Sequence, residues 1–162
     1  MRILWGFGRF FFKLSFRNSF KYRNFILSVF GAKLGNSVHI YSSCAVYYPW
    51  NLEVGDYSSI GEWVTIYNIG KIVIGERSTI SHLSHLCSGS HDYTNPTLPL
   101  LRNQITIGSE CWICSSALIC PNVTISDRAI VGAGSVCTKD VEQDFIVAGN
   151  PAKFVKKRII NE

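Results

Sequence analysis

Aliphatic side chains recur at intervals of six residues along most of this 162-residue chain, with a few interruptions. Fourteen of the fifteen positions in the series are Ile, Val or Leu: Leu34, Ile40, Val46, Val54, Ile60, Ile66, Ile74, Ile80, Leu86, Ile107, Ile113, Ile119, Ile125, Val131 and Cys137. A helix would repeat its apolar positions every three or four residues, and an exposed strand would alternate every second residue. A six-residue period therefore predicts short strands joined by turns, three of which make one coil of a β-solenoid.

The fourth residue after each aliphatic position is usually small or β-branched. These residues are Val38, Cys44, Ser58, Val64, Ser78, Ser84, Ser90, Cys111, Ala117, Val123, Ala129, Ser135 and Val141. The interior of a narrow three-sided solenoid has room only for small side chains at such positions. We therefore expect Cys44, Cys111 and Cys137 to be small core hydrophobes. The single C-x-x-C pair, Cys111 and Cys114, is weak evidence for zinc or redox chemistry.

The spacing of the coil starts divides the chain into parts. Successive starts at 34, 54 and 74 are twenty residues apart, whereas 107 and 125 are eighteen apart and 74 and 107 are thirty-three apart. The long interval predicts a loop over residues 92–106 that projects from one corner, and loops on a rigid scaffold often carry function. We expect an all-β solenoid domain of about five coils over residues 34–145.

The first thirty-three residues follow a different pattern. Basic residues three to four apart, at Arg9, Lys13, Arg17 and Lys21, alternate with Phe, and the segment ends on Gly31. This pattern predicts an amphipathic helix or helix pair with a glycine cap over residues 1–33. Such a segment could cover the open edge of the first coil, or rest on an anionic membrane, or do both. Capping is the interpretation we favour.

Charge is arranged as a basic head, an acidic body and a basic tail. Residues 1–33 carry seven basic residues and no acid, residues 34–152 carry five basic and ten acidic residues, and the last ten carry four basic residues and one acid. The basic ends suit phosphate on a lipid or a small ligand, and no nucleic-acid-binding signature is present. No apolar run reaches the roughly 18 to 20 residues of a membrane span, and no signal peptide is evident. We expect a cytoplasmic protein with access to the inner face of the membrane.

Three features together resemble the hexapeptide-repeat acyltransferases: the six-residue repeat, the segment LCSGSHDY at 86–93 and the ending AGNPAK at 148–153. Within that family the chain is most similar to sugar O-acetyltransferases of exopolysaccharide (colanic acid) biosynthesis, relatives of the maltose and galactoside acetyltransferases. The resemblance implies a left-handed parallel β-helix and a homotrimer that holds acetyl-CoA between subunits and uses no metal. It also implies that residues 146–162 form a basic tail that binds CoA.

The candidate catalytic residue is His91. A sugar hydroxyl is a poor nucleophile until a base removes its proton, and imidazole is largely neutral near pH 7. His91 matches the family's catalytic position, which implies direct transfer of the acetyl group without an acyl-enzyme. The same resemblance suggests Asn68, Asp92 and Tyr93 as acceptor-binding residues. Asp92 could either orient the imidazole or bind sugar hydroxyls, and both interpretations stay open.

Resemblance to the galactoside enzymes also places cofactor contacts. The candidates are Ser115, Ala133, Thr138, Lys139, Lys153 and Lys156. The lysines have an independent rationale, because CoA carries a pyrophosphate and a 3′-phosphate that need counter-charge. Trp112 could wall the pantetheine groove or pack as a corner residue on a neighbouring subunit.

Other functions remain open from the sequence alone. The acceptor could be an amino sugar, in which case the reaction would be N-acetylation. The solenoid could be a non-catalytic binding protein, although such a protein has no need of a long loop after a His. A carbonic-anhydrase-like metal site would use His82, His85 and His91, but zinc needs three converging ligands and His85 and His91 are one hexapeptide apart.

Overall fold

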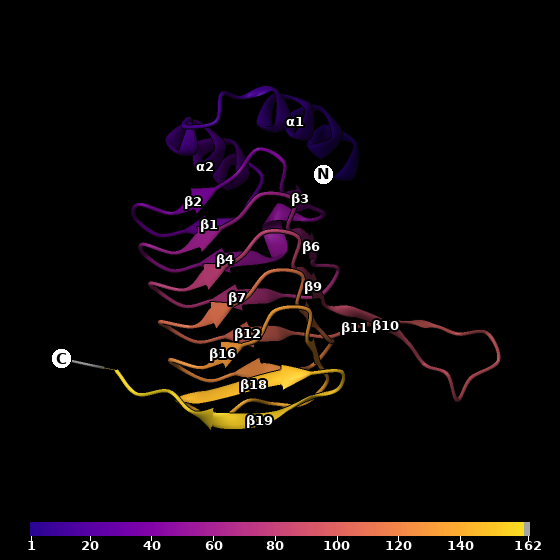
Figure 1. Cartoon of the computed structure of the whole chain (residues 1–162). Coiled ribbons are helices and arrows are strands. Elements are labelled where there is room, and N and C mark those ends of the chain that lie inside the picture. Colours follow the sequence, from indigo (N-terminus) through magenta and orange to yellow (C-terminus); the bar gives the residue numbers. More distant parts are fainter. Residues whose placement is uncertain (161–162) are drawn as a thin grey trace.

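The computed structural model describes residues 1–160, whose strands stack into three mainly parallel sheets that form a three-sided solenoid (Figure 1). Sheet 1 contains β1 (Lys33–Leu34), β4 (Leu52–Val54), β7 (Ile72–Ile74), β12 (Ile105–Ile107) and β15 (Thr124–Ile125). Sheet 2 contains β2 (His39–Ile40), β5 (Ser59–Ile60), β8 (Thr79–Ile80), β13 (Trp112–Ile113), β16 (Ile130–Val131), β18 (Phe145–Gly149) and β19 (Ala152–Lys157). Sheet 3 contains β3 (Ala45–Val46), β6 (Thr65–Tyr67), β9 (His85–Cys87), β14 (Leu118–Ile119) and β17 (Val136–Cys137).

The six-residue series forms the stacked interior of the solenoid, as predicted. Each aliphatic residue pairs in register with its counterpart one turn further on; in sheet 2, for example, Ile40 pairs with Ile60 and Ile60 pairs with Ile80. Fourteen of the fifteen side chains are buried, and Leu34 in the first strand is partly exposed. Stacking of like side chains thus builds one continuous core along the axis.

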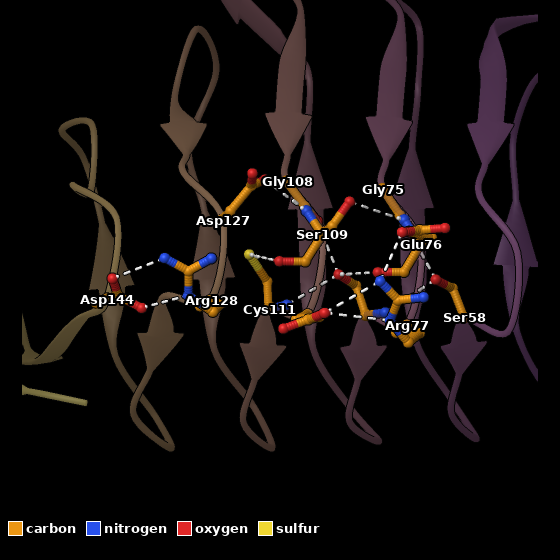
Figure 2. Close-up of polar contacts among 12 residues, drawn as sticks. Ser58, Gly75, Glu76, Arg77, Gly108, Ser109, Cys111, Asp127, Arg128 and Asp144 are labelled. Carbon is orange, nitrogen blue, oxygen red and sulfur yellow. Dashed lines mark hydrogen bonds and ion pairs between the residues drawn. The ribbon is translucent and has the colours of Figure 1, made fainter. Parts of the chain in front are cut away.

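The small residues of the second series lie at the turns, where buried hydroxyls join successive coils (Figure 2). The Ser58 hydroxyl donates to the carbonyl of Gly75 (2.6 Å) and accepts from the amide of Ser78 (2.9 Å). In the next turn the Ser78 hydroxyl donates to the carbonyl of Gly108 (2.7 Å) and accepts from the amide of Cys111 (2.9 Å). The hydroxyls therefore satisfy turn groups that would otherwise be buried without partners.

Twelve of the thirteen small positions are buried, including Cys44, Cys111 and Cys137, which confirms their assignment to the core. Burial raises the pKa of the Cys44 thiol to about 12 and that of Cys137 to about 11. Ser90 is the exception, because it lies on an extruded strand rather than in the solenoid. All six cysteines are free thiols.

The solenoid has about six turns rather than the five expected, because the chain continues to wind after the repeat ends. Val141 bridges to Ile125 in sheet 1, and β18 then pairs in parallel with β16. The next strand, β19, turns back antiparallel to β18 and ends the sheet. The segment 146–162, expected to be a basic tail, is therefore largely a strand pair that covers the open edge; residues 161–162 lie outside the described part.

Two helices close the other end of the solenoid, as the sequence predicted (Figure 1). They are α1 (Arg2–Leu14) and α2 (Phe20–Val29), and Gly31 follows α2 with a φ of +93°. The indole of Trp5 donates to the carbonyl of Val46 (3.1 Å), which fixes α1 to the first coil. None of the helices within residues 1–160 is long and apolar enough to cross a bilayer.

A fully buried arginine joins the helices to the solenoid. The guanidinium of Arg23 on α2 donates to the carbonyl of Ile40 (2.6 Å) in the first coil. It also donates to the hydroxyl of Ser15 and to the carbonyls of Phe16 and Arg17, all within 2.9 Å. The linker between the helices is thus held by one cation, whose hydrogen bonds offset the cost of its burial.

We expect Arg23→Ala to lower the free energy of unfolding by roughly 2 to 4 kcal/mol, because it leaves several buried carbonyls without donors. Urea unfolding followed by circular dichroism measures this change. Lys21→Ala, on the exposed side of the same helix, is the matched control and should change stability by less than about 0.5 kcal/mol. Equal stability of the two variants would contradict the role given to Arg23.

Candidate functional site

The extra residues of the first three coils all leave the solenoid at the same corner, between sheet 3 and sheet 1. In the first coil they form the short helix η1 (Pro49–Asn51), and in the second they form a turn over residues 68–71. In the third coil they form an antiparallel hairpin of β10 (Gly89–His91) and β11 (Leu100–Arg102), which projects sideways (Figure 1). The three insertions therefore follow one another along the axis.

The hairpin corrects the expected limits of the loop. Instead of an irregular loop over residues 92–106, the chain pairs from Gly89 to Arg102 and re-enters the solenoid in β12 at Ile105. Away from the solenoid, the backbone groups of an extruded segment have no neighbouring coil to bond, so they bond to each other. The irregular parts are residues 92–99 and the short connection 103–104.

Asn68 supports this corner from inside the molecule. Its side chain is fully buried, accepts from the amide of Tyr48 (2.9 Å) and donates to the carbonyl of Tyr48 (2.5 Å). Its own carbonyl accepts from the side chain of Asn51 (3.0 Å). Asn68 thus bonds the second insertion to the first, and its expected contact with an acceptor sugar stays a prediction.

Ser88 bonds the hairpin to the second insertion. Its buried hydroxyl accepts from the amide of Gly70 (2.9 Å) and lies 3.0 Å from the carbonyl of Tyr67. Its carbonyl accepts from the amide of Asn103 (2.8 Å), just after β11. A side chain at Gly70 would overlap the backbone of Asn103, so the base of the hairpin requires glycine there. The hairpin is therefore fixed at its base.

His91 is the last residue of β10, and its imidazole is exposed on the hairpin. The ring atom Nδ1 lies 2.5 Å from the carbonyl oxygen of Leu98 on the returning side. A carbonyl can only accept, so Nδ1 carries the proton of the neutral ring and Nε2 keeps its lone pair. This tautomer presents Nε2 as the basic nitrogen, which is the state that a general base needs.

Asp92 follows His91 but bonds within its own loop. One carboxylate oxygen accepts from the amide (3.0 Å) and the hydroxyl (2.6 Å) of Thr94, and these bonds lower the pKa of Asp92. The position that would orient the imidazole is taken by Leu98. The acceptor-binding role of Asp92 stays a prediction. Tyr93 is 88% exposed in the same loop.

Two of the expected cofactor residues lie at equivalent places in successive turns, at the corner between sheets 2 and 3. Ser115 follows β13 and Ala133 follows β16, and the amide of Gly134 donates to the carbonyl of Ser115 (2.9 Å). The hydroxyl of Ser115 also lies 3.2 Å from Nδ1 of His82 in the preceding turn. These residues form one line along the corner. Lys153 continues it, because it pairs with Ala148 on β18 next to β16.

The other expected cofactor residues lie elsewhere. Trp112 is 47% exposed on sheet 2, where its indole donates to the hydroxyl of Ser81 (2.9 Å). Lys156 is exposed on β19, opposite Ile146. Thr138 and Lys139 follow β17 at the end of sheet 3, at a different corner from Ser115. One chain therefore does not bring the whole set into a single groove.

The three histidines of the alternative metal site do not converge. His82 lies in a turn, His85 on β9 in sheet 3 and His91 on the hairpin, and burial lowers the pKa of His85. Within residues 1–160, no three His, Cys, Asp or Glu side chains are grouped so that they could hold a metal ion.

The fold and the site define a class of protein: a parallel β-helix that carries a histidine on an extruded hairpin. No family model matches the sequence. The chain is 39% identical over 143 residues to the putative colanic acid biosynthesis acetyltransferase WcaF of Escherichia coli (strain K12). This alignment covers 88% of this chain and 79% of that protein. The chain belongs to the hexapeptide-repeat acetyltransferase family, and its solenoid is the left-handed β-helix that the resemblance to this family implied.

The fold is shared with solved structures, among them two acetyltransferases. A maltose O-acetyltransferase from Clostridium difficile 630 superposes with a TM-score of 0.89 at 23% identity, over 98% of this chain and 87% of that one. A hexapeptide-repeat acetyltransferase from Vibrio cholerae O1 biovar eltor, solved with acetyl coenzyme A, gives a TM-score of 0.88 at 23% identity over the same shares. Helical cap, solenoid and hairpin all fall within the matched length.

Sequence reasoning found His91 but missed the groups that hold it. Leu98 acts through its backbone carbonyl, so its side chain gives no signal. The spacing of Asp92 and Thr94 does give a signal in the sequence. An Asp or Asn followed two positions later by Thr favours a turn in which the Asp or Asn side chain bonds the backbone. Asn95 and Thr97 repeat that spacing, and the Asn95 side chain bonds the amide (3.0 Å) and hydroxyl (2.9 Å) of Thr97.

Gly70→Ala tests the base of the hairpin. We expect it to lower the free energy of unfolding by roughly 1 to 3 kcal/mol and to speed amide hydrogen exchange in β10 and β11, because the new methyl group displaces Asn103. Gly6→Ala is the control, since the space around Gly6 is open. If the exchange rates in β10 and β11 of Gly70→Ala equal those of the unsubstituted protein, the contact between Gly70 and Asn103 does not support the hairpin.

Proposed function

We propose that this acetyltransferase moves the acetyl group of acetyl-CoA to a hydroxyl group of a sugar used in a cell-surface polysaccharide, such as exopolysaccharide, capsule or lipopolysaccharide. The observation that carries the proposal is the contact of His91 Nδ1 with the Leu98 carbonyl, which leaves Nε2 free to take a proton. The name of the Escherichia coli relative supports the choice of acceptor class.

In the proposed mechanism, Nε2 of His91 removes the proton of the acceptor hydroxyl as the oxygen attacks the thioester carbonyl. The new carbon–oxygen bond forms, and the carbonyl oxygen takes up negative charge that a nearby amide stabilises. Collapse of this intermediate breaks the carbon–sulfur bond, and the imidazolium returns its proton to the departing CoA sulfur. The Leu98 carbonyl keeps the ring in place and stabilises the imidazolium throughout.

Transfer through Cys44, Cys111 or Cys137 is disfavoured by the burial of their thiols. Cys44 and Cys137 are buried in the core, and their raised pKa values keep them protonated at neutral pH. Burial also raises the pKa of Cys111. A protonated, inaccessible thiol is a poor nucleophile, which supports direct transfer from CoA to the acceptor.

For the cofactor, we propose that CoA lies along the line of Ser115, Ala133 and Lys153, with Lys153 and Lys156 facing its phosphates. The absence of side-chain bulk at Ala133 leaves room beside the turn, and both lysines are exposed. Trp112 lies on β13, shortly before Ser115, and could wall the same groove. Thr138 and Lys139 lie at a different corner, so we propose that they complete the groove of a second subunit.

We propose a homotrimer for the same reason. His91 stands on a hairpin that extends away from its own solenoid, so a neighbouring subunit can supply the opposite wall of the site (Figure 1). We propose that this packing covers exposed aromatic residues such as Trp63 (65%) and Trp112 (47%). Sedimentation equilibrium should give about three times the chain mass of 18.2 kDa. An active monomer would rule out a site shared between subunits.

His91→Gln should lower kcat by roughly 10² to 10⁴, the usual contribution of a positioned general base, and leave the melting temperature almost unchanged. His39→Gln is the matched control; His39 lies on β2, stacked on Phe20, and its loss should change kcat less than about twofold. Release of CoA from acetyl-CoA in the presence of acceptor gives the rate. A kcat of His91→Gln close to that of the unsubstituted protein would contradict the role of His91 as general base.

Replacing Lys153 and Lys156 together by Ala should weaken acetyl-CoA binding by roughly 10- to 100-fold and flatten its dependence on salt, because two contacts to phosphate are lost. Calorimetry at two salt concentrations measures both effects. Lys33→Ala with Lys71→Ala is the charge-matched control, since those side chains pair with Glu53 (2.8 and 3.1 Å). Equal affinity in the two double variants would place the cofactor elsewhere.

The acceptor is found by incubating the protein with labelled acetyl-CoA and a panel of free sugars, nucleotide sugars, amino sugars and lipid-linked oligosaccharides. Label in a base-labile ester on a sugar would support O-acetylation. Label confined to the amide of an amino sugar would replace the proposed reaction by N-acetylation on the same site.

A further inference from the structure

The helical cap turns an apolar stripe away from the solenoid. Six large side chains on α1 are between 54% and 82% exposed: Ile3, Leu4, Phe7, Phe10, Phe11 and Leu14. Their spacing places them on one face of the helix, which we call the outer stripe. Trp5, Gly8 and Phe12 on a neighbouring face are buried against the rest of the cap. The helix is therefore apolar on its free face as well as its packed face.

The stripe continues onto α2 and the linker. Phe25 (68%) and Val29 (62%) on α2 are exposed, and Phe16 (88%) lies between the helices. A hollow of about 700 Å³ between the two helices is lined by Leu4, Phe7, Phe25 and Val29, among other apolar residues. A contiguous apolar surface of this kind on a soluble domain marks a place where something else binds.

The size and position of α1 fit a helix that lies flat in a membrane surface. Thirteen residues span roughly 20 Å, which is too short for the hydrocarbon core of about 30 Å. The helix sits at the extreme end of the molecule, with the solenoid on its other side (Figure 1). Phe and Leu are typical of the buried face of interfacial helices.

The charge of the cap indicates which partner covers the outer stripe, a lipid bilayer or a second copy of the cap. Residues 1–33 carry seven basic residues and no acid, so two caps placed face to face would bring like charges together. Anionic phospholipid headgroups complement that charge instead. Lys13 and Lys21 are exposed, whereas the guanidinium of Arg9 lies over the Tyr47 ring and Arg17 pairs with Glu62 (3.3 Å).

The contacts of the arginines therefore change the interpretation drawn from the sequence, in which the basic residues of this segment rest on an anionic membrane. Arg9 and Arg17 tie the cap to the solenoid, and the apolar side of α1 is the one left free. We propose that the outer stripe inserts into the surface of an anionic phospholipid bilayer, with Lys13 and Lys21 near the headgroup phosphates. Apolar insertion supplies most of the affinity, and charge adds preference for anionic lipid.

Flotation of the full-length protein with vesicles tests the proposal, using phosphatidylethanolamine mixed with phosphatidylglycerol and, separately, phosphatidylcholine. We expect the protein to float with the anionic vesicles and more weakly with phosphatidylcholine. Phe7→Gln with Phe10→Gln should weaken binding about 100-fold, at roughly tenfold for each apolar side chain. Tyr57→Gln with Ile159→Gln is the control, since these residues are 63% and 86% exposed outside the cap.

Lys13→Gln with Lys21→Gln should lower binding to anionic vesicles severalfold and leave binding to phosphatidylcholine unchanged. The proposal is overturned if the unsubstituted protein stays with neither kind of vesicle, or if the control variant loses as much binding as the Phe7 and Phe10 variant. Concentration-dependent self-association that the same Phe substitutions abolish, without vesicle binding, would identify a second copy of the chain as the occupant instead.

Discussion

The stacking of like aliphatic side chains on one another in successive turns is the interaction on which the rest of this structure depends. Ile40, Ile60 and Ile80 lie in register, and a slip of one residue in any coil would turn its aliphatic side chains outward. The register leaves the corners as the places where residues can be added without breaking the stack. Insertions are therefore confined to turns, and in this chain the first three coils use the same corner.

The position of the hairpin follows from this confinement of insertions to one corner. Asn68 bonds the second insertion to Tyr48 in the first, and Ser88 bonds the third to Gly70 in the second. The stack of insertions starts under the helical cap, whose Trp5 bonds the first coil. The hairpin that carries His91 is thus supported by a column of buried hydrogen bonds, although its tip is exposed. A rigid base with an exposed imidazole suits the proposed site that a neighbouring subunit completes.

The sequence predicts the parts of this structure that depend on side-chain periodicity. The fifteen aliphatic positions, the helical cap and the place of the extruded segment all follow from residue types and spacing. The sixth turn does not, because Phe145–Gly149 pairs through its backbone after the repeat has ended. The buried bonds of Asn68 to Tyr48 are not visible in the sequence either, because they join residues twenty positions apart through a corner insertion. The Leu98 carbonyl is likewise invisible in sequence, since any residue could supply it.

The central claim is that the fold presents His91 as a base by fixing its tautomer through Leu98. The nitrogen-15 chemical shifts of the His91 ring, measured in labelled protein at a pH where the ring is neutral, test this directly. The structure predicts a protonated Nδ1 and an unprotonated Nε2. The shift pattern of the other tautomer, with the proton on Nε2, would contradict the claim, because Nε2 could then not accept the proton of an acceptor hydroxyl.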